Sequence, residues 1–587
     1  MQAPVSPPDI KKRSSNQRRR RRRRPRNKKT QEDQEDSLYQ PRNLQRRDVS
    51  LTDLISEATA LERQLVELSK NIDAATEDEI VYVRRHLQGI YRHILVHDLL
   101  FASHHRIDDK MWRLIFYPTI EEIRTKLRKL NPATDQGKRP ALLKQLAQYL
   151  DTSFQYYRDM NSRIKNEYSV DVASIGVDLF RQSASTDEQV AIVLQSNYIC
   201  MGDLSRYRAS QTISREDKKT ADGYWRMAKD CYHRAIDASR TSGKPYSQLA
   251  LVSVSSGSAI DVVWYYCMSL AMKHASTVAR DNLKAFYSKL RFSSSDEDVG
   301  AQPPKQIARF AESFLQIHKQ TMFSNGSLDT AQLTVPDNLC TSLAKIIHFA
   351  AKDPANEKSA ASMLHIFKNT LTRVIGILII TVWDLGEQMK KKGSNSTQLQ
   401  MLQGYLMAFG FKMFAELFKV IQSTWSPLKE HMDPDQIVRI EDIVDTAILP
   451  GVSIWCTFFF SNLPLMAQFC AVNANTEIRS GVRARESEKR QLVRAMQAFL
   501  SAIIAHPMFP DPVDHVLPIT YPVSEDKVLL GIQPLIRFHA MVDFYKEIGY
   551  EDQGSLARKQ VRWGRVRELV KRLADSNQGR AKIQCDR

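Results

Sequence analysis

The sequence predicts an all-α protein, with a helical bundle followed by a solenoid-like array of helical hairpins. Glycine and proline are scarce, at 21 and 23 among 587 residues. Their usual combined share is about 12%, so turn-rich β architectures are disfavoured. Apolar residues recur at spacings of three and four along most of the chain, as on one face of an α-helix. No stretch alternates hydrophobic and polar residues for long enough to require a sheet.

Residues 1–48 are expected to form a disordered, arginine-rich arm. Residues 1–30 contain thirteen Lys and Arg but only one acid, Asp9, and so carry +12 of the net charge of +18. The arm contains an unbroken run of Arg18, Arg19, Arg20, Arg21, Arg22, Arg23 and Arg24. A run this dense repels itself and has no apolar face to bury. Two compatible roles remain open: a nuclear-import signal, and a nucleic-acid contact that neutralises phosphates.

Four to five antiparallel helices are predicted before residue 210, which makes a bundle. Ser50 and Asp53 resemble a capping box at the start of the first helix. Pro118 interrupts the third helix, so a kink or a short break is expected there. The expected helices cover about residues 51–68, 77–102, 108–130, 139–168 and 187–208.

Two degenerate tetratricopeptide-like hairpins are predicted next. Such a repeat has a small residue in its first helix and a small–aromatic–small triplet in its second helix. The first unit consists of Gly202 with Ala228, Tyr232 and Ala235. Residues 209–222 are inserted between its two helices. The second unit consists of Tyr246, Leu249, Ala250, Val262, Tyr266 and Ser269.

A second helical domain is expected at residues 305–587, after a linker at 293–304. Its helices are predicted at about 305–324, 338–352, 359–391, 396–424, 434–448, 452–472, 485–505 and 557–574, with a non-helical connection at 506–524. Residues 374–383 carry no charge and are expected at the centre of this domain. Residues 448–472 also lack charge over 25 positions, but two prolines interrupt them. We therefore expect buried core helices there and no contact with a membrane.

The sequence contains no P-loop, zincin or serine-hydrolase signature. The 14 histidines are not clustered at metal-ligand spacing, and the seven cysteines form no CxxC pair. A disulfide framework and a zinc module are therefore not expected. We expect no catalysis, no metal and no cofactor.

Residues 198–208, YICMGDLSRYR, are the most informative segment for function. Arg206 places a planar guanidinium fork beside the phenol of Tyr207, and this combination suits a phosphate group. The same fork binds a carboxylate equally well, so an ion pair with Asp203 is the alternative.

The chain resembles the SMG/EST-type family in the runs GDLSRYR, YWRMAKDCYHRAI, GKPYSQLALVSV and DVVWYYCMSLA. The segments MWRLIFYPTIEEIR and VSEDKVLLGIQPL extend the resemblance to roughly residues 50–540. Members of this family are adaptors of nonsense-mediated mRNA decay, related to a telomerase-associated subunit. The resemblance implies a 14-3-3-like domain with tetratricopeptide-like hairpins at residues 49–292. Only 52 residues follow Leu535, too few for the nuclease domain of one family branch.

The resemblance also implies phosphate-binding roles for individual residues. Arg206 stands at the position of the family's phosphate-contacting arginine, with Tyr207 alongside. A second family contact is a lysine, and Tyr117 occupies its position here. Arg113 and Arg124 share the helical stripe of Tyr117. They are expected either to supply the missing charge or to form a solvated basic face.

The resemblance implies a phosphoprotein-binding adaptor in nonsense-mediated mRNA decay, cytoplasmic and nuclear, whose ligand is the phosphorylated up-frameshift RNA helicase. A paralogous 14-3-3-like adaptor is a further candidate partner. The alternative is a nucleic-acid-binding subunit of telomerase or another RNP, which contacts RNA or telomeric DNA through the basic arm. Arm-driven binding is steep in salt because counterions are released, whereas a buried phosphate clamp is screened less.

Overall fold

The structure is a computed structural model of the chain. It describes residues 50–571 with gaps, of which the longest are 170–184, 293–301, 324–336, 430–442, 466–493, 503–520 and 545–557. Several predicted elements therefore lie outside the described residues. These are the arginine run and the larger part of the linker, of the helix at 485–505 and of the connection at 506–524. The chain forms two compact units, residues 1–91 and 92–587.

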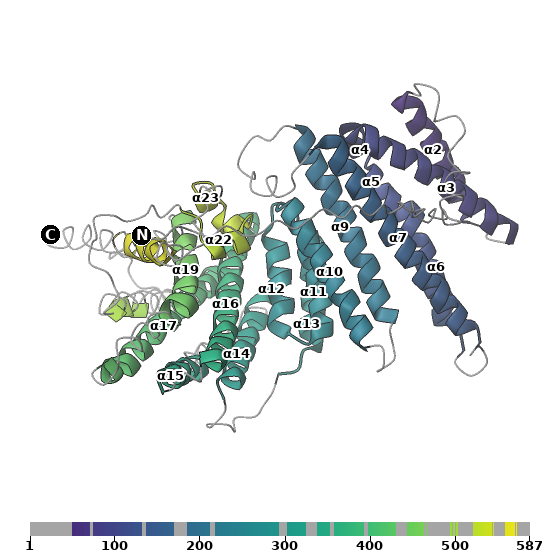
Figure 1. Ribbon diagram of the computed structural model, residues 1–587. Coiled ribbons are helices and arrows are strands. Elements are labelled where there is room, and N and C mark those ends of the chain that lie inside the picture. The colour runs from purple at the N-terminus through teal and green to yellow at the C-terminus, as the bar shows by residue number, and fades with distance from the viewer. Residues whose placement is uncertain are drawn as a thin grey trace, which may run out of the picture. The chain divides into compact units, whose positions relative to one another are not determined.

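The regular elements of the described residues are helices (Figure 1), apart from an isolated bridge between Ser242 and His274. This confirms the all-α prediction. The helices of the first half are α2 (Leu51–Leu68), α3 (Ala74–His97), α4 (Leu99–His104), α5 (Ile107–Lys110), the π-helix η1 (Met111–Phe116), α6 (Tyr117–Lys129), α7 (Lys138–Tyr168), α9 (Ser185–Gln211), α10 (Lys218–Ala238), α11 (Lys244–Ser256), α12 (Ala259–Ala271) and α13 (Ala279–Lys289). Those of the second half are α14 (Pro303–Phe323), α15 (Asp337–Lys352), α16 (Glu357–Lys392), α17 (Thr397–Lys429), the π-helix η5 (Val444–Ile448), α19 (Leu449–Ser461), α22 (Ser524–Leu529), the 3₁₀-helix η6 (Gln533–Leu535) and α23 (Ile536–His539). Residues 558–569 are also helical.

The first unit contains α2 and most of α3. Ser50 is the N-cap of α2 as predicted, but its hydroxyl accepts the N–H of Thr52 at 3.2 Å and not that of Asp53, the partner in the predicted capping box. The Tyr91 hydroxyl donates a hydrogen bond of 2.5 Å to Glu62, which joins the two helices through their side chains. The hydrogen bond of a buried tyrosine thus ties α3 to α2.

Two helix breaks shape the start of the second unit. The expected helix at 77–102 is divided at Asp98, whose carboxylate accepts the N–H of Phe101 at 2.8 Å and caps α4. The break expected at Pro118 takes the form of the π-helix η1, which ends directly before α6. Proline lacks the N–H that an α-helix directs at the carbonyl four residues earlier. Bonds that run from i to i+5 avoid this mismatch.

The tetratricopeptide-like hairpins are confirmed by their packing. Helices α9, α10, α11 and α12 pack in succession (Figure 1). The ring of Tyr232 occupies the place that a Cβ on Gly202 would need, so α9 and α10 approach closely only because this residue is glycine. Ala228 and Ala235 are fully buried on either side of that ring. The insertion at 209–222 lengthens α9 to Gln211 and lies partly in α10.

Helix α16 is the centre of the C-terminal helices. It contacts α12, α14, α15, α17 and α19, and residues 374–382 are all buried, as predicted. Two helical segments, Lys358–Lys391 and Val444–Ser461, have the length and hydropathy of a membrane span. The fold buries 67% and 89% of their most apolar windows. Such burial is typical of core helices.

A buried polar cluster joins α13, α14 and α16. Tyr287 Oη lies 2.6 Å from His318 Nδ1, and His318 Nε2 lies 3.1 Å from Thr381 Oγ1. The Thr381 hydroxyl donates to the carbonyl of Ile377 at 2.7 Å. His318 therefore carries its proton on Nε2 and accepts from Tyr287 through Nδ1. Burial lowers the pKa of His318 to about 3, so the imidazole is neutral.

Candidate phosphate-binding site

The candidate site lies where α6 approaches the C-terminal half of α9. Helix α6 carries Arg124, and α9 carries Arg206 and Tyr207. The guanidinium carbons of Arg206 and Arg124 lie 4.6 and 4.9 Å from the centroid of the Tyr207 ring. Both cations are therefore held by cation–π contacts on one aromatic ring.

Tyr207 stays a neutral hydrogen-bonding phenol in this setting. Burial and the nearby Asp203 carboxylate together raise its pKa to about 12, although Arg206 opposes both effects. A neutral phenol both donates and accepts a hydrogen bond. The ring thus combines a contact surface for two arginines with one polar atom.

Arg206 is half-buried, with 19% of its side chain exposed. Its Nη2 lies 3.0 Å from Asp203 Oδ1, and its Nε donates to the Tyr232 hydroxyl at 3.4 Å. Burial opposes the charge on Arg206 and is the largest single influence, but Asp203, Tyr232 and Tyr207 together outweigh it and raise the pKa of the guanidinium. The ion pair that the sequence left as the alternative is present.

Tyr232 gives Asp203 a second partner. Its hydroxyl donates to Asp203 Oδ1 at 2.7 Å. A guanidinium has five N–H donors, and only some of those on Arg206 are directed at Asp203 and Tyr232. Arg206 can therefore turn toward an anion while Asp203 keeps a hydrogen bond.

Arg124 shares a carboxylate with another arginine. Its Nη1 lies 3.0 Å from Glu121, and Arg128 pairs with the same Glu121 side chain. Two cations on one anion leave a local surplus of one positive charge. Tyr117, at the position where the family has a lysine, is 38% exposed.

Arg113 lies apart from this group. Its Nε pairs with Asp109 at 3.0 Å, one turn earlier in the chain, and 60% of its side chain is exposed. The predicted stripe assumed 3.6 residues per turn from 113 to 124. The π-helix η1 includes Arg113 and breaks that regularity. Of the two predicted helpers, only Arg124 is brought to Tyr207.

Three residues of the site were not assigned a site role from the sequence. From the sequence, Tyr232 was identified only as a packing residue and Asp203 only as a competitor, and Glu121 was given no role. The spacing of Glu121 to Arg124 indicates a helical ion pair and was a usable signal. Arg208, the last residue of the RYR run, instead lies 3.4 Å from Asp151 on α7.

The remaining predictions concern the arginine run and metal binding. Arg18 to Arg24 lie outside the described residues. Within the described part of the chain, no group of three or more His, Cys, Asp or Glu side chains is placed to hold a metal ion.

Two family models match the chain. The one described as Est1 DNA/RNA binding domain matches residues 228–539, and the one described as Telomerase activating protein Est1 matches residues 106–211. The second match includes α6 and α9, which carry the candidate site.

Curated relatives match over shorter segments. The chain is 26% identical over 239 residues to the telomerase-binding protein EST1A of Danio rerio, covering 39% of this chain and 15% of that protein. It is 24% identical over 253 residues to the nonsense-mediated mRNA decay factor SMG7 of Danio rerio, covering 41% and 20%. SMG7 of Arabidopsis thaliana is 27% identical over 225 residues, covering 35% and 21%. The matched segments thus span about a fifth or less of these relatives.

A solved structure supports the fold. The chain is similar to one described as "Crystal structure of Est1 and Cdc13", with a TM-score of 0.50 and 12% sequence identity. The similarity covers 88% of this chain and 96% of that one. At this identity it bears on the helical architecture alone.

Proposed function

The chain belongs to the EST1/SMG family, and we propose that it is a non-catalytic, phosphoprotein-binding adaptor in nonsense-mediated mRNA decay. The proposed ligand is the phosphorylated up-frameshift RNA helicase. The proposed locations are the cytoplasm and the nucleus, and a paralogous 14-3-3-like adaptor is a proposed partner. The observation that carries the proposal is the pair of guanidiniums on the Tyr207 ring.

The charges at the site favour an anionic ligand. Arg124, Arg128 and Arg206 supply three positive charges, while Glu121 and Asp203 supply two negative charges. Phosphate carries close to two negative charges at neutral pH and offers three acceptor oxygens. Two nearby guanidiniums match such a group better than a single carboxylate ligand.

A binding assay with matched peptides tests the proposal. Helicase peptides are made with and without phosphate on one Ser or Thr each, and their affinity for the full chain is measured by fluorescence anisotropy. We expect a phosphorylated peptide to bind and its unphosphorylated twin to bind at least about tenfold more weakly, since one charged hydrogen bond accounts for that factor. Equal affinities for every pair contradict the proposal.

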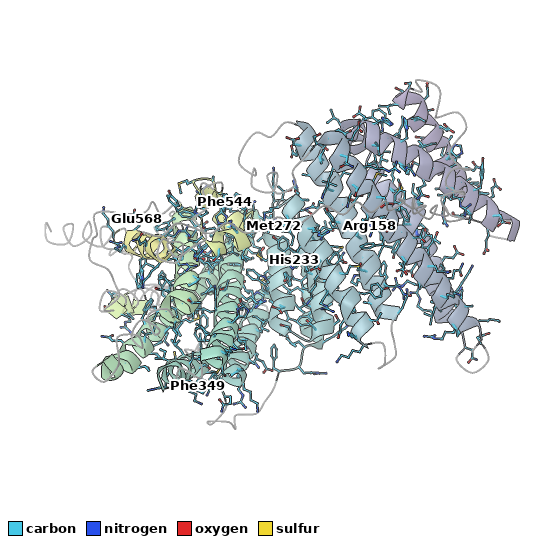
Figure 2. The ribbon with its side chains drawn as sticks, in the orientation of Figure 1. Arg158, His233, Met272, Phe349, Phe544 and Glu568 are labelled. Atoms are coloured by element: carbon cyan, nitrogen blue, oxygen red, sulfur yellow. The ribbon has the colours of Figure 1, made fainter. Side chains whose placement is uncertain are left out.

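A charge reversal locates the binding. Arg206→Glu is expected to abolish phosphopeptide binding while the helical circular dichroism spectrum is unchanged. The control is Arg158→Glu on α7 (Figure 2). Arg158 is exposed, and its ion pair with Asp159 is long, at 4.0 Å. If both variants bind like the wild type, the phosphate is read elsewhere. An unfolded Arg206→Glu chain would make Arg206 structural.

The second candidate function is a nucleic-acid-binding subunit of telomerase or another RNP. It is favoured by the +12 charge of residues 1–30 and by the family model described as Est1 DNA/RNA binding domain. Deleting residues 1–30 is expected to reduce RNA and telomeric-DNA affinity and to flatten its salt dependence. Unchanged nucleic-acid binding would move that activity to the folded body. Loss of nuclear accumulation alone would support the import-signal role.

A further inference from the structure

The helix at residues 558–569 is basic in sequence but is buried in the fold. Its arginines at the centre, Arg562 and Arg565, are 7% and 0% exposed. A basic helix near the end of a chain is usually assigned to a nucleic-acid or membrane surface. These two guanidiniums are used inside the protein instead.

Each buried arginine has its own carboxylate. Arg562 directs Nε and Nη2 at the two oxygens of Glu525, at 2.8 and 2.7 Å. Arg565 directs Nη1 and Nη2 at the two oxygens of Asp526, at 2.9 and 2.7 Å. Both pairs are bidentate, the geometry in which a guanidinium fork fits a carboxylate best. Arginines three residues apart on one helix thus match adjacent acids on α22.

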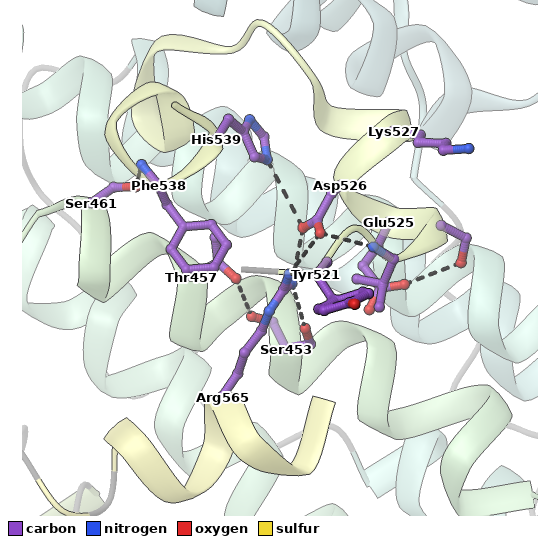
Figure 3. A network of polar contacts seen from close by, with 12 residues as sticks. Ser453, Thr457, Ser461, Tyr521, Glu525, Asp526, Lys527, Phe538, His539 and Arg565 are labelled. Carbon is purple, nitrogen blue, oxygen red and sulfur yellow. Dashed lines mark hydrogen bonds and ion pairs between the residues drawn. The ribbon is translucent and has the colours of Figure 1, made fainter. Parts of the chain in front are cut away.

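The second N–H on each terminal nitrogen of Arg565 is also satisfied. Its Nη1 donates to the Ser453 hydroxyl of α19 at 3.1 Å, and its Nη2 donates to the carbonyl of Tyr521 at 3.1 Å (Figure 3). The Phe538 ring lies 4.8 Å from its guanidinium carbon. Nearby, Lys559 pairs with Asp445 of η5 at 2.7 Å. The helix is therefore held by charge against three separate elements.

The apolar face and the charges of this helix have different roles. Val561, Trp563, Val566 and Leu569 are buried and supply the favourable transfer free energy. Buried ion pairs add little net stability, because the loss of hydration offsets the attraction between the charges. An unmatched buried charge, however, is strongly unfavourable. The arginines therefore set the register of the helix more than its affinity.

The segment that receives this helix also contacts the hairpin region. Arg240, which follows α10, donates to the carbonyl of Lys527 in α22 at 2.7 Å. Gly531, at φ +93°, lies so close to the Arg240 carbonyl that a side chain would collide with it. Residues 521–542 thus lie between the end of α10 and the helix 558–569.

We propose that the helix 558–569 is a latch that docks and undocks as a unit in an acidic slot formed by Asp445, Glu525 and Asp526. Undocking exposes the apolar face of the helix, but it also returns the charges of Arg562, Arg565 and their partner acids to water. The hydration of these charges lowers the free-energy cost of undocking relative to that of an all-apolar contact of the same size. While docked, the latch fixes residues 521–542 between α19 and α10.

Hydrogen exchange on the unaltered full chain tests whether the helix moves as a unit. We expect the amides of 558–569 to exchange together, at least about tenfold faster than those of α16, because a sub-global opening requires less free energy than global unfolding. Exchange of 558–569 at the rate of α16 would overturn the proposal.

A peptide added in trans tests the arginine key. The probe is a fluorescent peptide of residues 556–572, and the control peptide carries Arg562→Glu and Arg565→Glu. The full-length chain with the same two reversals should bind the native peptide, whereas the wild-type chain, whose slot is filled, should bind it at least about tenfold more weakly. Equal binding of both peptides by the reversed chain would show that Arg562 and Arg565 do not contribute to binding in the slot.

Exchanging the charges of both partners provides a second test, which holds even if the chain with reversed arginines is unstable. Reversing only Arg562 and Arg565 should lower Tm by about 10 °C. Adding Glu525→Arg and Asp526→Arg should recover at least half of that loss. No recovery, or no loss in the first variant, contradicts a charge-keyed latch.

Discussion

The hydroxyl of Tyr232 donates a hydrogen bond of 2.7 Å to the carboxylate of Asp203. The same tyrosine is the aromatic residue of the tetratricopeptide-like pattern, and its ring packs on Gly202. Asp203 in turn holds Arg206 at 3.0 Å. The packing of the first hairpin and the orientation of Arg206, the candidate phosphate-binding residue, therefore both depend on the side chain of Tyr232.

A methyl group at Gly202 should disturb both the fold and the site. Gly202→Ala places a Cβ into the Tyr232 ring, and such overpacking destabilises by about 1–3 kcal/mol. We expect a lower Tm in thermal unfolding and weaker phosphopeptide binding. The control is Gly223→Ala in α10, where no atom lies within 4 Å and helix propensity predicts a gain of up to about 1 kcal/mol. A tolerated Gly202→Ala would argue against the close packing of α9 on α10.

Arg124 and Arg113 should differ in their effect on binding. Arg124→Ala removes a cation 4.9 Å from the Tyr207 ring, and we expect phosphopeptide affinity to fall about tenfold or more. Arg113→Ala is the matched control, because Arg113 pairs with Asp109 away from that ring. Titration calorimetry of both variants measures the difference. Equal losses would mean that the stripe predicted from the sequence describes the phosphate site better than the side-chain contacts do.

The ring of Tyr207 should matter more than its hydroxyl. Tyr207→Phe keeps the surface that holds both guanidiniums, so we expect phosphopeptide affinity to stay within about threefold of the wild type. Tyr207→Ala removes that surface and should weaken binding by about tenfold or more, as the two arginines lose their shared support. A Tyr207→Phe variant as weak as Tyr207→Ala would assign the phosphate contact to the hydroxyl.

Restoring the family lysine offers a gain-of-function test. Tyr117 is 38% exposed and close enough to Tyr207 to influence its pKa. Tyr117→Lys adds a cation there, so phosphopeptide affinity should rise or stay unchanged. Val81→Lys, an exposed site in the first unit, controls for a general increase in positive charge. Loss of binding in Tyr117→Lys would mean that α6 does not contribute to the phosphate site.

The free energy of unfolding should decrease as the pH is lowered, because of His318. Its pKa is lowered to about 3 in the fold by burial, against about 6.5 in an unfolded chain. Only the unfolded state takes up a proton between these values, so the stabilising contribution is complete above pH 6.5 and declines as the pH falls toward 3. The slope from this residue approaches about 1.4 kcal/mol per pH unit.

Urea unfolding between pH 7.5 and 5.5 measures this slope before most carboxylates titrate. His318→Gln should reduce the slope, whatever its effect on stability at neutral pH, and part of the slope should remain because burial also lowers the pKa of His539 to about 4. His365→Gln, at an exposed position of α16, should leave it unchanged. A slope that is unchanged in His318→Gln would place the linkage entirely on other groups.

The sequence predicted the helices well where apolar periodicity was long and uninterrupted. The expected helix at 139–168 is observed as Lys138–Tyr168. The break at Asp98 was missed because apolar spacing continues across it and only the cap interrupts the backbone. Helix α13 was missed because it buries few side chains over eleven residues.

The part of the site that depends on local helical spacing was predictable from the sequence. Arg206 and Asp203 are three residues apart on one helix, so their ion pair could be anticipated from local spacing. The contact of Arg124 with Tyr207 joins residues far apart in the chain. Pro118 signalled a break in the helix, but not that the break would be a π-helix that includes Arg113. The pairing of Arg562 and Arg565 with adjacent acids likewise depends on packing that periodicity does not describe.

The acids of the slot are synthesised before the arginines that neutralise them. Residues 526 and 565 are separated by a stretch of chain that takes about 2–8 s to translate at 5–20 residues per second. During that interval Glu525 and Asp526 can remain hydrated only if residues 521–542 stay away from α19. The C-terminal helices therefore finish assembling late, and a ribosome pause between residues 540 and 558 would prolong a state in which the apolar face of α19 is open to chaperones.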